Sequence, residues 1–77
     1  MNNADLYKTK DQFIASTLYS LGVKLASSEW RDGKCFLYFK NQDKCDQIVS
    51  AYYSGELTVN PRTLFDSFKT IKAIIFD

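Results

Sequence analysis

The stretch VKLASSEWRDGKCFLYFK, residues Val23–Lys40, decides the fold, and its pattern predicts a β-hairpin. Asp32-Gly33 lies between two extended runs, and this dipeptide favours a type I′ turn, which needs positive φ at both central residues. The second half, Lys34–Lys40, is the most strand-like run in the chain. We therefore expect the fold to be organised around this hairpin.

Both faces of the hairpin are predicted to carry bulky apolar groups, because side chains alternate along a strand. If Arg31 and Lys34 close the turn, one face carries Trp30, Cys35, Leu37 and Phe39. The other face is expected to carry Val23, Leu25, Phe36 and Tyr38. An antiparallel sheet with one face in water shows a cleaner alternation. We therefore expect helices on one face and a further helix or a partner on the other.

The composition bounds the class of protein. The chain has 77 residues, which predicts one domain over residues 1–77, with a flexible tail over residues 1–5. Ten basic and nine acidic residues leave a net charge of +1, so bulk charge does not draw the chain to DNA or to a membrane. The sequence has no bilayer-spanning apolar run and no signal-peptide pattern, and we expect Cys35 and Cys45 to be buried free thiols. These features predict a cytoplasmic protein.

One helix is predicted before the hairpin and another after it. A short strand at Leu6–Lys8 leads into the first helix, for which Thr9 and Gln12 have the spacing of a capping box and Gly22 is the expected end. The second helix is expected to begin after Asn41, as N-cap, and to end at Ser54-Gly55.

A weak strand and a third helix follow. Glu56–Val59 has β-forming residues, and Asn60-Pro61 is typical of a helix start, with Asn as N-cap and Pro at the first helical position. The resulting order predicts an α+β fold: the split βαβ (ferredoxin-like) plan βαββαβ with an added C-terminal helix. In that plan the first and third strands are central and the first two helices share one sheet face. Without the strand at Glu56–Val59, the fold reduces to a three-stranded version.

The residues argue against an enzyme. There is no histidine, which removes the common general base near neutral pH and the commonest metal ligand. Cys35 and Cys45 lack the paired spacing of a zinc site, and Asp43 and Asp46 are typical of a solvated helix face. The isolated glycines form no phosphate-binding pattern. We therefore predict no catalytic residue, no metal ligand and no cofactor.

The C-terminal helix has an apolar arc of about 200°, wider than the roughly 100° that one-sided packing needs. Either the helix covers the second face of the hairpin, or part of the arc is a contact surface for a second copy or another protein. We favour a non-catalytic protein-interaction module that self-associates as a homodimer or modulates a larger protein, with no membrane partner. The residues expected to make this contact are Phe65, Phe68, Lys72, Ile74 and Phe76.

A weak single-stranded nucleic-acid binder is the alternative. The strand Lys34–Lys40 reads Lys-x-Phe-x-Tyr-x-Lys, which would put two aromatic rings and two cations on one sheet face. The Gly-Phe core of RNA-recognition modules is absent, and the near-zero net charge argues against strong phosphate-driven affinity. The residues expected in this alternative are Lys8, Lys34, Phe36, Tyr38 and Lys40.

Several short runs resemble a known group of sequences. They are Tyr7–Asp11, Leu21-Gly22, Cys35-Phe36, Tyr52–Gly55 and Val59–Arg62. These runs are similar to a family of small uncharacterised domains encoded by low-GC Gram-positive bacteria and their phages. The resemblance nominates no active site and implies only a context, namely an accessory protein of a mobile element that binds or modulates a larger host component.

Overall fold

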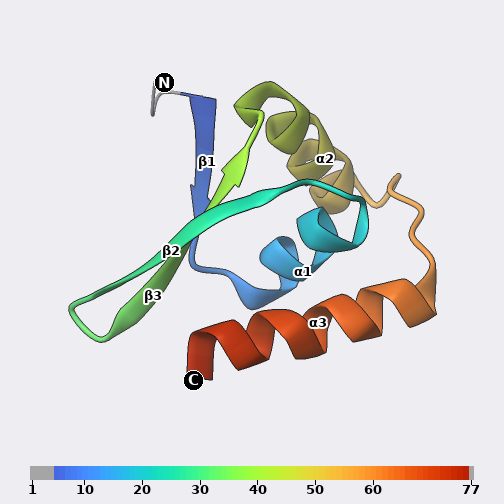
Figure 1. Ribbon diagram of the computed structural model, residues 1–77. Coiled ribbons are helices and arrows are strands. Elements are labelled where there is room, and N and C mark those ends of the chain that lie inside the picture. Colours follow the sequence, from blue (N-terminus) through green and yellow to red (C-terminus); the bar gives the residue numbers. More distant parts are fainter. Residues whose placement is uncertain (1–4, 77) are drawn as a thin grey trace.

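The computed structural model describes residues 5–76, which form three strands and three helices (Figure 1). They are β1 (Leu6–Thr9), α1 (Gln12–Ser20), β2 (Leu25–Arg31), β3 (Lys34–Lys40), α2 (Gln42–Ser54) and α3 (Pro61–Phe76). The predicted α+β class is confirmed. Apart from Asp5, the tail predicted over residues 1–5 lies outside the described residues.

The strands form one antiparallel sheet in the order β1-β3-β2. This is the split βαβ order without its fourth strand, so β3 is central as predicted whereas β1 is an edge. The segment Glu56–Val59 forms no strand in the structure. One reason is that both of its ends are engaged elsewhere: the Glu56 N–H donates to the Ala51 carbonyl at 3.1 Å, and Asn60 caps α3. The reduced three-stranded version of the fold is therefore the one adopted.

The hairpin turns where the sequence predicts. Asp32 has a φ of 53° and Gly33 a φ of 78°, as a type I′ turn requires. Arg31 pairs with Lys34, and Trp30 pairs with Cys35 on the expected face.

A β-bulge changes the other end of the hairpin. Ser27 pairs with Tyr38, but Leu25 pairs with Phe39 instead of Lys40, so Ala26 is the extra residue. A one-residue shift turns every earlier side chain to the opposite face. The prediction that Val23 and Leu25 share a face with Phe36 and Tyr38 is therefore wrong: Val23 is buried in the core and Leu25 packs against it.

All three helices lie on the same side of the sheet (Figure 1). The core between sheet and helices is a single cluster that consists of Ile14, Ala15, Leu18, Val23, Cys35, Leu37, Phe39, Cys45, Ile71 and Ile75. Ile71 and Ile75 of α3 belong to this cluster, and α3 lies beside α1. The expectation that a helix covers the second sheet face is therefore wrong. Because the bulge turns Val23 and Leu25 inward, that face carries fewer apolar side chains than the sequence pattern predicts.

The helix ends follow local hydrogen bonds, with one correction. The N-cap of α1 is Asp11 and not Thr9, because the Asp11 carboxylate accepts from the N–H groups of Phe13 at 2.8 Å and Ile14 at 3.1 Å. Thr9 ends β1 and its hydroxyl accepts from the Asp11 N–H instead. The predicted ends of α2 and the predicted start of α3 are confirmed.

Candidate interaction surfaces

The first candidate surface is a row of side chains along the seam between α1 and α3. We call it the aromatic strip, and it consists of Phe13, Phe65, Phe68, Lys72 and Phe76. Its four α3 members lie within about 80° of helical arc at 3.6 residues per turn. Phe13, Phe65 and Phe76 are 62%, 63% and 67% exposed. These large apolar side chains therefore stay in contact with water.

The strip is held in place by a contact between the two helices and by another within α3. The rings of Phe13 and Phe68 stack with centroids 5.5 Å apart and planes within 2°. The Lys72 ammonium lies 5.6 Å from the Phe68 centroid, over the ring. An apolar groove of about 230 Å³ runs beside this stack, and it is lined by Phe13, Ser16, Thr17, Tyr52, Leu64, Phe65 and Phe68.

Four of the five residues predicted for protein contact therefore share one side of α3, and the fifth does not. Ile74 lies about 180° around the helix from Phe65. It is half-buried, packs against the core, and lines a separate hollow with Tyr19 and Leu25. Phe13 of α1 is not among the residues predicted for protein contact, because that prediction rests on the apolar arc of the C-terminal helix alone.

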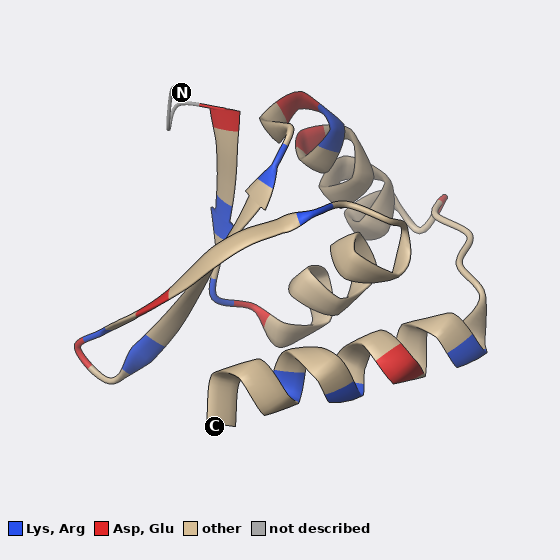
Figure 2. Cartoon of the chain, in the orientation of Figure 1, with Lys and Arg blue, Asp and Glu red and all other residues tan. Residues whose placement is uncertain are grey.

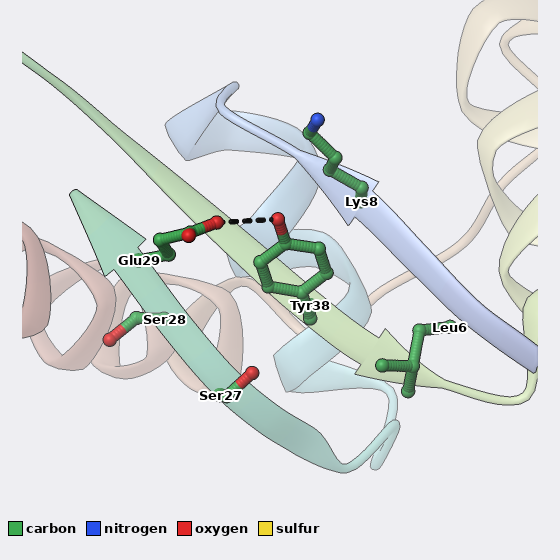
Figure 3. Close-up of a pocket in the computed structure, with 6 residues that line it drawn as sticks. All are labelled: Leu6, Lys8, Ser27, Ser28, Glu29 and Tyr38. Carbon is green, nitrogen blue, oxygen red and sulfur yellow. Dashed lines mark hydrogen bonds between the residues drawn. The ribbon is translucent and has the colours of Figure 1, made fainter. Parts of the chain in front are cut away.

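The second candidate surface is the face of the sheet that points away from the helices, which we call the open sheet face. The strand registers place on it Leu6, Lys8, Ser27, Glu29, Arg31, Lys34, Phe36, Tyr38 and Lys40. In Figure 3, Lys8, Glu29 and Tyr38 point to the viewer's side while the helices lie behind the strands. All five residues predicted for nucleic-acid binding, Lys8, Lys34, Phe36, Tyr38 and Lys40, are on this face.

Hydrogen bonds and charged contacts hold several side chains of the open sheet face in place. The Tyr38 hydroxyl donates to the Glu29 carboxylate at 2.9 Å, and Arg31 donates to both oxygens of the same carboxylate at 3.1 and 3.2 Å (Figure 3). The hydrogen bond from Tyr38, followed by the bonds from Arg31, lowers the pKa of Glu29 below its ordinary value, and the same carboxylate raises the pKa of Tyr38. The Lys8 ammonium lies over the Phe36 ring, 4.6 Å from its centroid.

Positive charge dominates this face. Lys8, Arg31, Lys34 and Lys40 oppose the single carboxylate of Glu29. Figure 2 shows basic residues at both ends of β3 and on β1, whereas α2 and α3 carry residues of both signs. A shallow depression of about 620 Å³ crosses the face, and it is lined by Leu6, Lys8, Ser27, Ser28, Glu29 and Tyr38.

The two thiols are placed for packing. Cys35 and Cys45 are free and buried in the core. Burial raises the pKa of both thiols, and Asp46 raises that of Cys45 further. The reactive thiolate is therefore disfavoured at both positions. Within residues 5–76, no group of three or more His, Cys, Asp or Glu side chains could hold a metal ion, and no helix is long and apolar enough to cross a membrane.

The fold defines a class of small α+β domains, with a three-stranded antiparallel sheet covered by helices on one face. Residues 4–77 match the model of the family described as Domain of unknown function (DUF5659), and the chain belongs to that family. This match confirms the resemblance to small uncharacterised domains. No curated protein and no solved structure matches the chain.

Proposed function

We propose that this domain is a non-catalytic protein-interaction module that self-associates through the aromatic strip. The observation that carries the proposal is that Phe13, Phe65 and Phe76 each keep more than three-fifths of their surface exposed. Clustered apolar surface of this kind is typical of protein–protein contacts, whose centres are enriched in aromatic residues. A partner that covers the strip removes these rings from water, which favours association.

The one charged residue of the strip, Lys72, favours a second copy in antiparallel orientation. Lys72 lies between Phe68 and Phe76 on the same side of α3, so parallel pairing of two α3 helices would set Lys72 against its own copy. Antiparallel pairing about a two-fold axis near the middle of α3 instead brings each Lys72 to the ring of the other copy's Phe65. A lysine above an aromatic ring is attracted to it, as Lys72 already is to Phe68.

We also propose a cytoplasmic location and an origin as a mobile-element accessory protein of bacteria or their phages. The support for the location is that Cys35 and Cys45 are free thiols with no disulfide partner among the described residues. The support for the origin is the sequence resemblance. Fractionation of expressing bacterial cells tests the location, and recovery of the protein outside the cytoplasm would contradict it.

Sedimentation velocity over a wide range of protein concentration tests self-association. We expect dimers at about 100 μM and monomers on dilution, because dimerisation follows mass action. The double variant Phe65→Ser, Phe76→Ser is expected to remain monomeric. Tyr53→Ser is the matched control, since Tyr53 is 71% exposed and lies outside the strip, and it should dimerise like the wild type.

Two results would overturn the proposal. One is a wild-type protein that remains monomeric up to about 500 μM, where even weak dimers form. The other is a dimer that persists unchanged in the Phe65→Ser, Phe76→Ser variant while circular dichroism shows both proteins folded. In the second case the dimer would use another surface.

A further inference from the structure

We propose that the open sheet face binds single-stranded nucleic acid, with one base stacked on Phe36, the next on Tyr38, and the phosphates on Lys8, Lys34 and Lys40. This inference does not rest on the proposed self-association, because the aromatic strip lies on the helical side of the molecule. It rests on a combination of rings and cations on a face that no described helix covers.

The two rings have the spacing that stacking on a sheet requires. Phe36 and Tyr38 are two residues apart on the central strand, which separates them by about 7 Å along one face. Both are half-buried, so their ring positions are set while part of each ring remains accessible. Bases of a single strand are not paired with a partner strand and can turn outward to stack on such rings, whereas the bases of a duplex cannot.

The missing glycines of the RNA-recognition pattern do not affect this face. That pattern places a basic residue first and aromatic residues third and fifth, as Lys34, Phe36 and Tyr38 are placed. Its second and fourth positions correspond to Cys35 and Leu37. Both of these side chains are buried on the helical side of β3. They therefore contribute to the core and leave the open side of the strand unchanged.

The charge of the face complements a phosphate backbone. Lys34 and Lys40 lie at the two ends of β3, and Lys8 pairs with Tyr38 from the neighbouring strand. The one carboxylate, Glu29, is held by both Arg31 and the Tyr38 hydroxyl. Arg31 therefore balances its charge, and the three lysines remain for phosphates. The net charge of +1 describes the whole chain and hides this local excess of positive charge.

Lys8 is expected to make different contacts in the free protein and in the complex with nucleic acid. In the structure its ammonium lies 4.6 Å from the centroid of the Phe36 ring. A base that stacks on Phe36 would displace this ammonium, which would then be free to contact the adjacent phosphate. The contact between Lys8 and Phe36 would thus be replaced by two contacts, one between the base and Phe36 and one between the phosphate and Lys8.

Fluorescence anisotropy with labelled oligothymidylate and oligouridylate of about ten nucleotides tests the proposal. Because the contacts are to base faces and phosphates, we expect DNA and RNA to bind within about threefold of each other, and a duplex of equal length to bind at least about tenfold more weakly. With three phosphate contacts, we expect the affinity for single strands to fall about 20-fold between about 50 and 200 mM salt.

Variants separate stacking from charge. Phe36→Leu and Tyr38→Leu keep apolar bulk but lose the ring, and each should weaken binding at least about fivefold. Tyr38→Phe, which keeps the ring and loses only the bond to Glu29, should bind within about twofold of the wild type. Lys34→Gln with Lys40→Gln should reduce the steepness of the salt dependence by about 1.4 in logarithmic slope. Lys69→Gln on α3 is the matched charge control and should leave the slope unchanged.

Several results would overturn the proposal. They are an absence of binding at low salt, duplex binding as tight as single-strand binding, and unchanged binding in the Phe36→Leu, Tyr38→Leu double variant. Because Tyr38→Phe retains the ring, its folding and binding show whether any loss in the leucine variants comes from stacking. Phe65→Ser, Phe76→Ser should bind the oligonucleotide normally, so this test and the dimerisation test fail independently.

Discussion

At the start of α1, Thr9 and Asp11 can each accept a hydrogen bond from a free backbone N–H. Thr9 pairs with Leu37 in the sheet, so its backbone is extended. It also lies two residues before Asp11, which is the residue that caps the helix. Its hydroxyl accepts from the Asp11 N–H, and the Asp11 carboxylate then accepts from Phe13 and Ile14. The strand thus decides which residue caps the helix.

Replacing Asp11 by Ala is expected to lower the free energy of unfolding by about 0.5–2 kcal/mol, because two N–H groups of the first turn lose their acceptor. Urea denaturation measures the change. Gln12→Ala serves as the control and should change stability by less than about 0.5 kcal/mol, since no capping box forms. A larger loss in Gln12→Ala than in Asp11→Ala would contradict this account.

At the scale of elements, α3 is the helix whose position differs most from the one predicted from the sequence. It packs beside α1 on the covered side of the sheet and contributes Ile71 and Ile75 to the core. The Phe13–Phe68 stack joins the two helices at the edge of this core. One side of α3 therefore points inward, while Phe65 and Phe76 remain in water.

A double-mutant cycle with Phe13→Leu and Phe68→Leu should give a coupling of about 0.5–1.5 kcal/mol in the free energy of unfolding, as expected for stacked aromatic pairs. Chemical denaturation of the two single variants and the double variant provides the measurement. A cycle between Phe13 and Tyr53 is the control and should show no coupling, since α2 holds Tyr53 in contact with Tyr52 instead. Additive effects of Phe13→Leu and Phe68→Leu would mean that the stack does not join the helices.

At the scale of the whole molecule, one core on one side of the sheet holds the domain together. A chain of 77 residues has a free energy of unfolding of only about 4–12 kcal/mol. Both thiols lie in this core, and burial raises their pKa above the ordinary 9.0. The stability of the domain is therefore linked to pH on the alkaline side.

Raising the pH from about 7.5 to 10 is expected to lower the free energy of unfolding. In the unfolded chain the thiols lose protons near pH 9.0, whereas burial moves this loss to higher pH in the folded chain. The unfolded state therefore binds fewer protons in this range and is increasingly favoured as the pH rises. Urea titrations under reducing conditions at several pH values measure this slope. Cys35→Ala with Cys45→Ala should show a shallower fall, and an equal fall in both proteins would assign the effect to other groups, such as Tyr7, whose pKa burial also raises.

The local features of the fold could be predicted because each depends on neighbouring residues. The turn at Asp32-Gly33 needs only positive φ, and the caps at Asn41 and Asn60 need only N–H groups two or three residues away. The bulge at Ala26 could not be predicted in this way. It depends on burying Leu25 against a core that the rest of the chain supplies.

The candidate surfaces divide in the same way. Alternation along one strand predicts that Lys34, Phe36, Tyr38 and Lys40 share a face, and helical periodicity predicts that Phe65, Phe68 and Phe76 share a side. Neither pattern shows whether another element covers them. That Lys8 lies over Phe36 and that Phe13 stacks on Phe68 are contacts between separate elements.

By itself, the sequence determined the α+β class, the hairpin, the central position of its second strand and most helix ends. Each of these follows from backbone conformation, side-chain periodicity or hydrogen bonds within a few residues. Only the tertiary structure decided that the three helices lie on one side of the sheet, that Phe36 and Tyr38 of β3 therefore remain partly accessible, and that Phe65 and Phe76 of α3 remain exposed. The physical reason is that the exposure of a side chain depends on which distant parts of the chain pack into the single core. The one-residue bulge at Ala26, near the start of β2, directed Val23 and Leu25 into that core on the helical side.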